Sequence, residues 1–211
     1  MGEGAHPQGE ATVDTTLDEA AIRRIIDAAT EVLAEEGPTR ATIKWVAREA
    51  RVDANVVSAR WPTMSDLMAT VLDDLAERIE VQARFRYWDM PDLDEEADAE
   101  WTRLLALFSR LVGRSLLDGI NPAELQDHYP LVERMVKGGV DLGLDERTAR
   151  YRTFECYAIE WGWRLFGPHL TVACGLEDES PEDIRAELTR LQWRLRDMGP
   201  VAPPSDPGTT D

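Results

Sequence analysis

Long apolar runs, cysteine and histidine are all scarce in this chain of 211 residues. No run of about 18 apolar residues occurs, so the sequence predicts no membrane-spanning helix. The 2 cysteines and 3 histidines are scattered, without the spacing of a metal site. Positively charged residues are also few, because the chain has 23 lysines and arginines against 41 aspartates and glutamates, which gives a net charge of −18. Such an acidic surface limits nonspecific adsorption to nucleic acid.

Signals for export and for catalysis are missing as well. The N-terminal MGEGAHPQGEATVDTT has neither a basic flank nor an apolar core, so we expect a cytoplasmic protein. Cys156 and Cys174 lie in apolar surroundings, which indicates reduced core thiols rather than a disulfide. His128 is typical of a helix end, and neither a nucleophile motif nor a Gly-rich phosphate loop occurs. We therefore predict no enzymatic activity, no cofactor and no metal.

The segment from residue 18 to residue 75 has the signals of four consecutive helices. In the first, Thr16 or Asp18 can cap the start, apolar residues recur every three or four positions, and Gly37 ends the helix. Thr42 can cap a second helix over residues 43–50, whose buried side consists of Val46, Ala47 and Ala50.

The next two helices follow at once. Residues 51–53 form a turn, and Asp53 can cap a third helix over residues 54–60, in which Val56 and Val57 point inward. Pro62 ends it. Thr63 and Asp66 make a near capping box for the fourth helix, whose apolar residues are Leu67, Met68, Val71, Leu72 and Leu75. This layout is typical of a helix-turn-helix DNA reader.

The segment resembles the TetR family of bacterial one-component regulators. The resemblance rests on the apolar first helix ending in Gly37, the run Thr42-Ile43-Lys44-Trp45-Val46-Ala47-Arg48-Glu49-Ala50 with Val52, and Trp61-Pro62-Thr63 leading into Asp66-Leu67-Met68. It implies an all-α homodimer. An N-terminal domain would bind DNA, and a C-terminal domain of variable sequence would bind a ligand and dimerise.

Several positions depart from the residues with which the family usually reads DNA. Arg51 replaces a glycine and Asn55 a small residue, while a threonine, tyrosine, histidine and lysine are replaced by Val56, Ser58, Arg60 and Met64. Between residues 37 and 64, however, five cations and two anions leave a net charge of +3, as phosphate contacts require. We favour retained DNA binding. The alternative is a TetR-like helical dimer that has lost specific DNA binding and acts as a ligand-binding or protein-interaction module.

Seven residues are candidates for DNA contact. Asn55 and Arg60 suit base edges, because Asn pairs with adenine and Arg with guanine in the major groove. The others suit phosphates and are Thr42, Lys44, Arg48, Ser58 and Thr63. Arg60 has a structural alternative as a surface arginine or in an ion pair with Asp66.

We divide the chain into a disordered tail (1–16), a helix-turn-helix domain (17–64), a helical ligand-binding and dimerisation domain that includes the connecting helix (65–198), and a second disordered tail (199–211). Residues 89–100 carry seven acids and indicate a solvated connection rather than a metal site. Beyond it, helices are expected over residues 101–117, 122–128, 131–142, 145–166 and 181–197, with Gly167-Pro168 as a break.

The helix expected over residues 145–166 is dense in aromatics, which must be buried in a core, a pocket or a subunit interface. Its two apolar sides, and the placement of Trp193 off the main stripe of the last helix, indicate that both helices also pack against a partner subunit. In the resembling family the last two long helices form a four-helix dimer bundle.

A ligand pocket is expected among the middle helices, although the same side chains suit an ordinary core. The candidates are Trp101, Leu105, Phe108, Tyr129, Met135, Phe154, Tyr157 and Trp161. Arg110 and Arg114 would favour an anion if they turned inward, but a solvated face is the simpler interpretation. The sequence therefore predicts a ligand-responsive regulator, most simply a repressor. Its dimer would bind a pseudo-palindromic double-stranded DNA operator and respond to a small, largely apolar effector.

Overall fold

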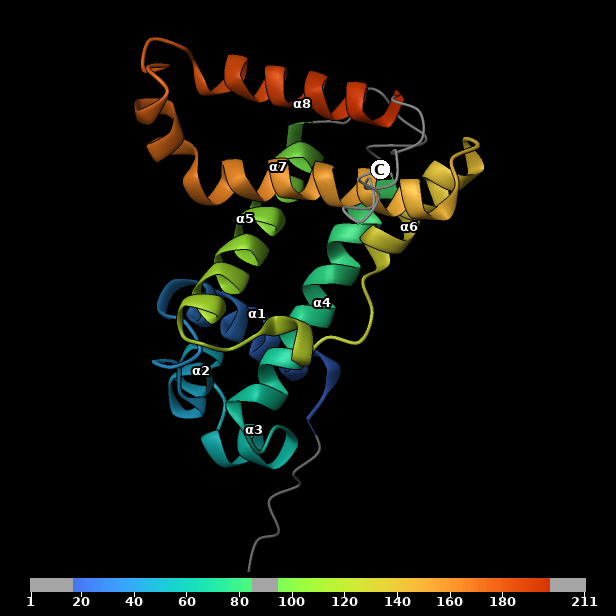
Figure 1. Ribbon diagram of the computed structural model, residues 1–211. Coiled ribbons are helices and arrows are strands. Elements are labelled where there is room, and N and C mark those ends of the chain that lie inside the picture. The colour runs from blue at the N-terminus through green and yellow to red at the C-terminus, as the bar shows by residue number, and fades with distance from the viewer. Residues whose placement is uncertain (1–16, 85–94, 198–211) are drawn as a thin grey trace, which may run out of the picture.

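The computed structural model describes residues 17–84 and 95–197, and all regular structure in them is helical, which confirms the expected all-α fold (Figure 1). The elements are α1 (Glu19–Glu36), α2 (Ile43–Ala50), α3 (Ala54–Arg60), α4 (Met64–Arg84), α5 (Glu95–Leu117), the 3-10 turn η2 (Pro122–Glu124), α6 (Pro130–Asp141), α7 (Glu146–Ala173) and α8 (Pro181–Asp197). In Figure 1, α1–α3 cluster at one end, α4 and α5 lead away from them, and α7 and α8 lie across the other end.

The first three helices begin where the sequence predicts, because a side chain satisfies a free backbone N–H at each start. Asp18 accepts a hydrogen bond from Ala21 N–H at 2.6 Å. Thr42 does the same for Trp45 N–H at 3.2 Å, and Asp53 accepts from Asn55 N–H at 2.7 Å. At α4 the predicted capping box is present, since the Asp66 carboxylate accepts from Thr63 N–H at 2.9 Å and Thr63 Oγ1 accepts from Asp66 N–H at 3.1 Å.

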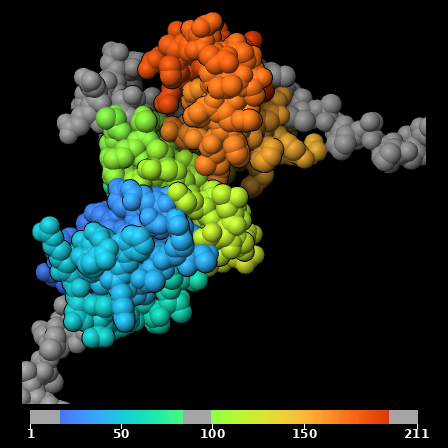
Figure 2. Space-filling model, turned by 90° about the vertical axis from the view of Figure 1, so that its left-hand side faces the viewer, coloured from blue at the N-terminus to red at the C-terminus, as the bar shows by residue number. Residues whose placement is uncertain are grey.

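One continuous core runs from the N-terminal cluster into the rest of the molecule. Its fully buried side chains come from α1, α2, α3, α4 and α5 and include Ile25, Leu33, Val46, Val57, Leu67, Leu72, Leu75, Leu104, Leu107 and Leu111. Because α4 contributes to both ends of this core, it fixes the three small helices to the remainder of the chain. Figure 2 shows the N-terminal block at one end of the molecule and α7 at the other, with α5 between them.

Three expected boundaries are wrong. Residues 95–100 are helical, because acids are favourable near the positive N-terminal end of a helix. Only residues 122–124 of the helix expected over 122–128 form, as a 3-10 turn, and Pro130 then starts α6 at the position where its missing N–H costs nothing. Finally, α7 continues through Pro168 to Ala173, since one lost backbone donor does not end a helix whose later bonds persist, including Cys174 N–H to Leu170 O at 2.9 Å.

The remaining expectations concern the two tails, the acidic connection and the two cysteines. Both predicted disordered tails and residues 89–94 of the acidic connection lie outside the described residues. Both cysteines are free thiols, as expected, but only Cys156 is buried. Cys174 is exposed because it follows the last turn of α7, so its assignment to the core is wrong.

Candidate DNA-binding surface and ligand cavity

The turn between α2 and α3 is closed by a left-handed residue. Arg51 has φ 58° and ψ 45°, and its N–H donates to Arg48 O at 3.2 Å. The next residue, Val52, donates its N–H to Ala47 O at 3.0 Å. These two bonds form a Schellman motif, which ends α2 and turns the chain sharply into α3. Arginine here takes a conformation that glycine adopts without steric cost.

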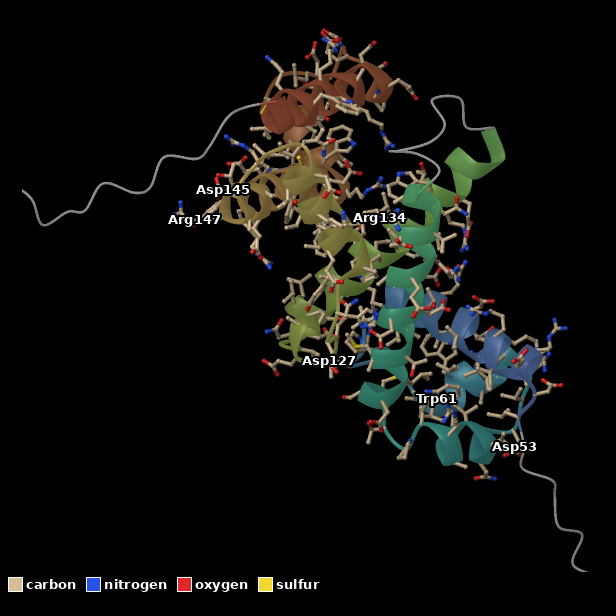
Figure 3. The ribbon with its side chains drawn as sticks, turned by 90° about the vertical axis from the view of Figure 1, so that its right-hand side faces the viewer. Asp53, Trp61, Asp127, Arg134, Asp145 and Arg147 are labelled. Carbon is tan, nitrogen blue, oxygen red and sulfur yellow. The ribbon has the colours of Figure 1, made fainter. Side chains whose placement is uncertain are left out.

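All seven candidate DNA contacts are exposed. They lie on α2, on α3 and at the start of α4, the end of the molecule where Figure 3 places Asp53. The hydroxyls of Thr42 and Thr63 also cap α2 and α4, so these two residues position the helices as well as face solvent. The ion pair considered for Arg60 and Asp66 is not formed, because Asp66 instead accepts hydrogen bonds from Thr63.

Two arginines of this surface are held against tryptophan rings. Arg48 lies 5.6 Å from the ring centroid of Trp45 and forms an ion pair with Glu49 at 2.8 Å. This hydrogen-bonded pair lowers the pKa of Glu49. Arg60 lies 5.7 Å from the ring of Trp61, which is buried between α3 and α4 and donates its indole N–H to Thr70 at 2.9 Å (Figure 3). The guanidinium of Arg60 is thus oriented by a fixed ring beneath it.

A cavity of about 300 Å³ lies among α4, α5, α6, α7 and the segment that contains η2. Its lining residues are Ala76, Ile79, Leu105, Phe108, Val112, Leu116, Asn121, Pro122, Ala123, Gln126, Tyr129, Pro130, Leu131, Val132, Tyr157 and Trp161. The wall is apolar or aromatic with a few neutral polar groups, which is the usual composition of a small-molecule site.

Three aromatic rings form one corner of this cavity. The rings of Phe108 on α5 and Trp161 on α7 meet edge to face, with centroids 5.7 Å apart and planes at 82°. Tyr157, one turn before Trp161, lies 6.2 Å from it. Such pairs hold each ring in place, so the corner presents a fixed aromatic surface to the cavity.

Of the eight expected ligand contacts, five line the cavity: Leu105, Phe108, Tyr129, Tyr157 and Trp161. Trp101 is buried in the core of α5, and Met135 packs half-buried against the core from α6. Phe154 is 69% exposed, because the inward face of α7 at this level carries Ala149, Thr153 and Cys156. These three residues therefore lie outside the lining of this cavity.

The two arginines considered for an anionic ligand also lie elsewhere. Arg110 is exposed on α5, and the Arg114 guanidinium donates to the main-chain carbonyl of Ala34 in α1 at 3.1 Å. One turn later Asp118 accepts from Thr39 N–H at 3.0 Å, and hydrogen bonds from Thr39 lower the pKa of Asp118. The C-terminal end of α5 thus holds the segment between α1 and α2.

Sequence reasoning missed two parts of the cavity wall. Ala76 and Ile79 on α4 resemble ordinary core residues, and residues 122–128, which include Pro122, Ala123 and Gln126, were expected to be helical. Only Gln126 gave a local signal, as a neutral amide in a short segment between Pro122 and Pro130.

Exposed apolar side chains gather on α7 and α8. They are Tyr151, Phe154, Phe166, Leu170 and Val172 on α7 and Leu191 and Trp193 on α8. Large apolar groups exposed together on two neighbouring helices are typical of an interface. We call these seven residues the α7/α8 apolar surface.

Within the described part of the chain, no cluster of three or more His, Cys, Asp and Glu side chains could hold a metal ion. The same residues include no helix that is both long and apolar enough to cross a membrane.

Residues 25–71 match the family model described as bacterial regulatory proteins, tetR family. The matched segment starts in α1, contains α2 and α3, and ends in α4. Among curated proteins, the HTH-type transcriptional repressor Rv3405c of Mycobacterium tuberculosis is 29% identical over 172 residues, which cover 81% of this chain and 86% of that protein. The HTH-type transcriptional regulator Mb3439c of Mycobacterium bovis has the same identity and coverage.

Two solved structures share the fold. The multidrug binding protein EbrR, complexed with imidazole, is 22% identical with a TM-score of 0.51, over 90% of this chain and 100% of that chain. A transcriptional regulator from Rhodococcus sp. Rha1 is 18% identical with a TM-score of 0.51, over 88% of this chain and 100% of that chain.

Proposed function

We propose that this chain, an all-α protein whose residues 25–71 match the model of the tetR family, is a member of that family that binds DNA as a dimeric transcriptional repressor controlled by a small molecule. The observation that carries the proposal is the coincidence of the family match with a complete helix-turn-helix whose candidate contacts are all exposed. The name repressor, given to one relative of 29% identity, supports the direction of control.

On the DNA, α3 would enter the major groove. Asn55 and Arg60 face outward from α3 and would contact base edges. The phosphate contacts would come from the start and exposed side of α2, from α3 and from the start of α4, through Thr42, Lys44, Arg48, Ser58 and Thr63. The stacking of Arg60 on Trp61 supports its role, because a guanidinium that is already oriented loses less freedom on binding a guanine edge.

The dimer would form through the α7/α8 apolar surface. A two-fold axis there would leave both α1–α3 clusters free at the far end of the molecule (Figure 1). Their recognition helices would then reach half-sites about 34–36 Å apart, or a multiple of that distance, which implies a pseudo-palindromic operator.

Control by a ligand would use the cavity and α5. One side of α5 supplies Phe108 and Val112 to the cavity wall, and its end supplies Arg114 and Asp118 to the contacts with Ala34 and Thr39. A ligand that binds two positions of α5 with different affinity would therefore change the position of the DNA-binding helices. A typical coupling of about 1–3 kcal/mol would change operator affinity roughly 5- to 150-fold.

Fluorescence anisotropy with duplex DNA from around the coding region of the protein tests the proposal. We expect saturable, salt-sensitive binding with a stoichiometry of one dimer per site. Replacing Lys44 by Ala should weaken binding to all sequences and reduce the salt slope by about 1, whereas Arg60→Ala should cost about 1–3 kcal/mol on the specific site only. Binding that is equal for operator and random DNA would favour a helical module without specific DNA recognition.

A further inference from the structure

The ligand cavity has a lining without formal charge. None of its sixteen lining residues is Asp, Glu, Lys, Arg or His. On neighbouring turns, Glu80 of α4 is paired with Arg134 of α6, which Figure 3 shows against α4. Arg110 of α5 is exposed to solvent, and Arg114 of α5 donates to the carbonyl of Ala34 in α1. A ligand that carries a charge would lose its hydration here without gaining a partner of opposite sign.

One polar group in this lining is unsatisfied. Gln126 is 5% exposed, and its side-chain Nε2 has no hydrogen-bond partner among the described residues. The other amide of the lining, Asn121, is engaged at both ends, since it accepts from Ala123 N–H at 3.2 Å and donates to Glu124 at 3.5 Å. A buried donor without an acceptor destabilises the protein, and a ligand that supplies the acceptor recovers that free energy.

The position of Gln126 defines where the ligand would carry its acceptor. Gln126 follows η2, which contributes Pro122 and Ala123 to the cavity wall, while Phe108 and Trp161 meet edge to face on α5 and α7. An apolar ring would pack against the aromatic corner. An oxygen on that ring would accept from the Gln126 amide once this side chain, whose Nε2 is closed to solvent, turns toward the ligand.

We propose that Gln126 is the polar recognition residue of this cavity and that the effector is an uncharged, ring-containing compound with a hydrogen-bond acceptor such as a ketone oxygen. The proposal deepens the proposed function, because it assumes that this cavity is the effector site. It assigns the recognition to one amide, with the rest of the lining supplying apolar contact.

Four probes on one carbon skeleton test this assignment with the full-length protein. They are tetralin, its ketone 1-tetralone, 1-aminotetralin as an ammonium, and tetralin-1-carboxylate, each titrated calorimetrically at neutral pH. The deciding quantity is the ratio of the Kd of 1-tetralone to that of tetralin, because the apolar skeleton cancels in it. Gln126→Leu should raise this ratio about tenfold, as expected for one lost hydrogen bond.

Two further variants control the experiment. Gln126→Glu replaces the donor by a charged acceptor of the same shape, and it should weaken 1-tetralone and strengthen 1-aminotetralin. Gln82→Leu removes an amide from α4 at a half-buried position outside the lining and should leave the ratio unchanged. Gln126→Leu should not lower the thermal midpoint, because it removes an unsatisfied donor from a buried site.

The proposal is overturned if Gln126→Leu leaves the ratio unchanged, if either charged probe binds the unmodified protein as tightly as 1-tetralone, or if none of the four probes binds it. These titrations contain no DNA. If the ratio shifts as expected while 1-tetralone leaves DNA affinity unchanged, the cavity chemistry stands and control by ligand is refuted. If the protein binds its operator but none of the four probes, DNA recognition stands and the proposed cavity chemistry is overturned.

Discussion

Replacing Arg51 by glycine should stabilise the folded protein. Arg51 has φ 58° after α2, where the Cβ of an L-residue is crowded at a cost of about 1–2 kcal/mol. Glycine avoids this cost but loses more freedom on folding, by about 0.4–1 kcal/mol. The difference predicts a net stabilisation of about 0.5–1 kcal/mol for Arg51→Gly. Both hydrogen bonds of the Schellman motif remain, because their donors and acceptors belong to the main chain.

Thermal unfolding followed by circular dichroism measures this effect. For a chain of this size a change of 1 kcal/mol shifts the midpoint by about 2–4 °C, so Arg51→Gly should raise Tm by about 1–4 °C. Arg51→Ala is the matched control, since it removes the same exposed guanidinium but keeps the Cβ. Its Tm should stay within about 1 °C of the parent.

Two results would refute the reasoning about Arg51. An equal rise in both variants would mean that the charged side chain, and not the backbone, destabilises the native turn. A fall in Tm for Arg51→Gly alone would mean that the left-handed conformation is not strained at this position.

Further predictions concern coupling, assembly and pH. Asp118→Ala removes the acceptor for Thr39 N–H and should abolish the effect of ligand on operator affinity while both ligand and DNA still bind; Asp118→Asn, which keeps an acceptor oxygen, should respond normally. Phe154→Glu should give a monomer in sedimentation at micromolar concentration, whereas Leu117→Glu, at a side chain 88% exposed on α5, should remain dimeric. The pKa of Glu100 lies below its usual 4.5, first through a hydrogen bond from Arg103 and then one from Arg78. Its stabilisation is therefore present above that value and is lost as the pH falls through the lowered pKa, so Glu100→Gln should flatten the acid limb of a Tm–pH profile.

The helix-turn-helix was predictable because its signals are local. Asp18, Thr42 and Asp53 each satisfy a backbone donor within three residues, so their sequence positions alone set the helix starts. The path of α7 was not predictable in this way. Pro168 ends a helix or lies within one according to the bonds that later residues retain, and those depend on the whole element.

The cavity was only partly predictable for a different reason. Phe108, Tyr157 and Trp161 stand out as aromatics at helical spacing, and they line the wall. Phe154 has the same spacing but faces outward, because periodicity shows that a helix has an apolar side without showing which neighbour covers it. The contribution of Ala76 depends on how α4 crosses α5, which no local signal encodes.

Two hydrogen bonds at the C-terminal end of α5 reach main-chain atoms of α1 and of the segment that follows it. Arg114 donates to the carbonyl of Ala34, a group that every residue supplies, and Asp118 accepts from the N–H of Thr39, which every residue except proline supplies. Side chains on α2 and α3 can therefore change, and with them the DNA sequence that is read, while this linkage keeps its chemistry. One ligand-binding domain could therefore be combined with DNA-binding helices of many different specificities.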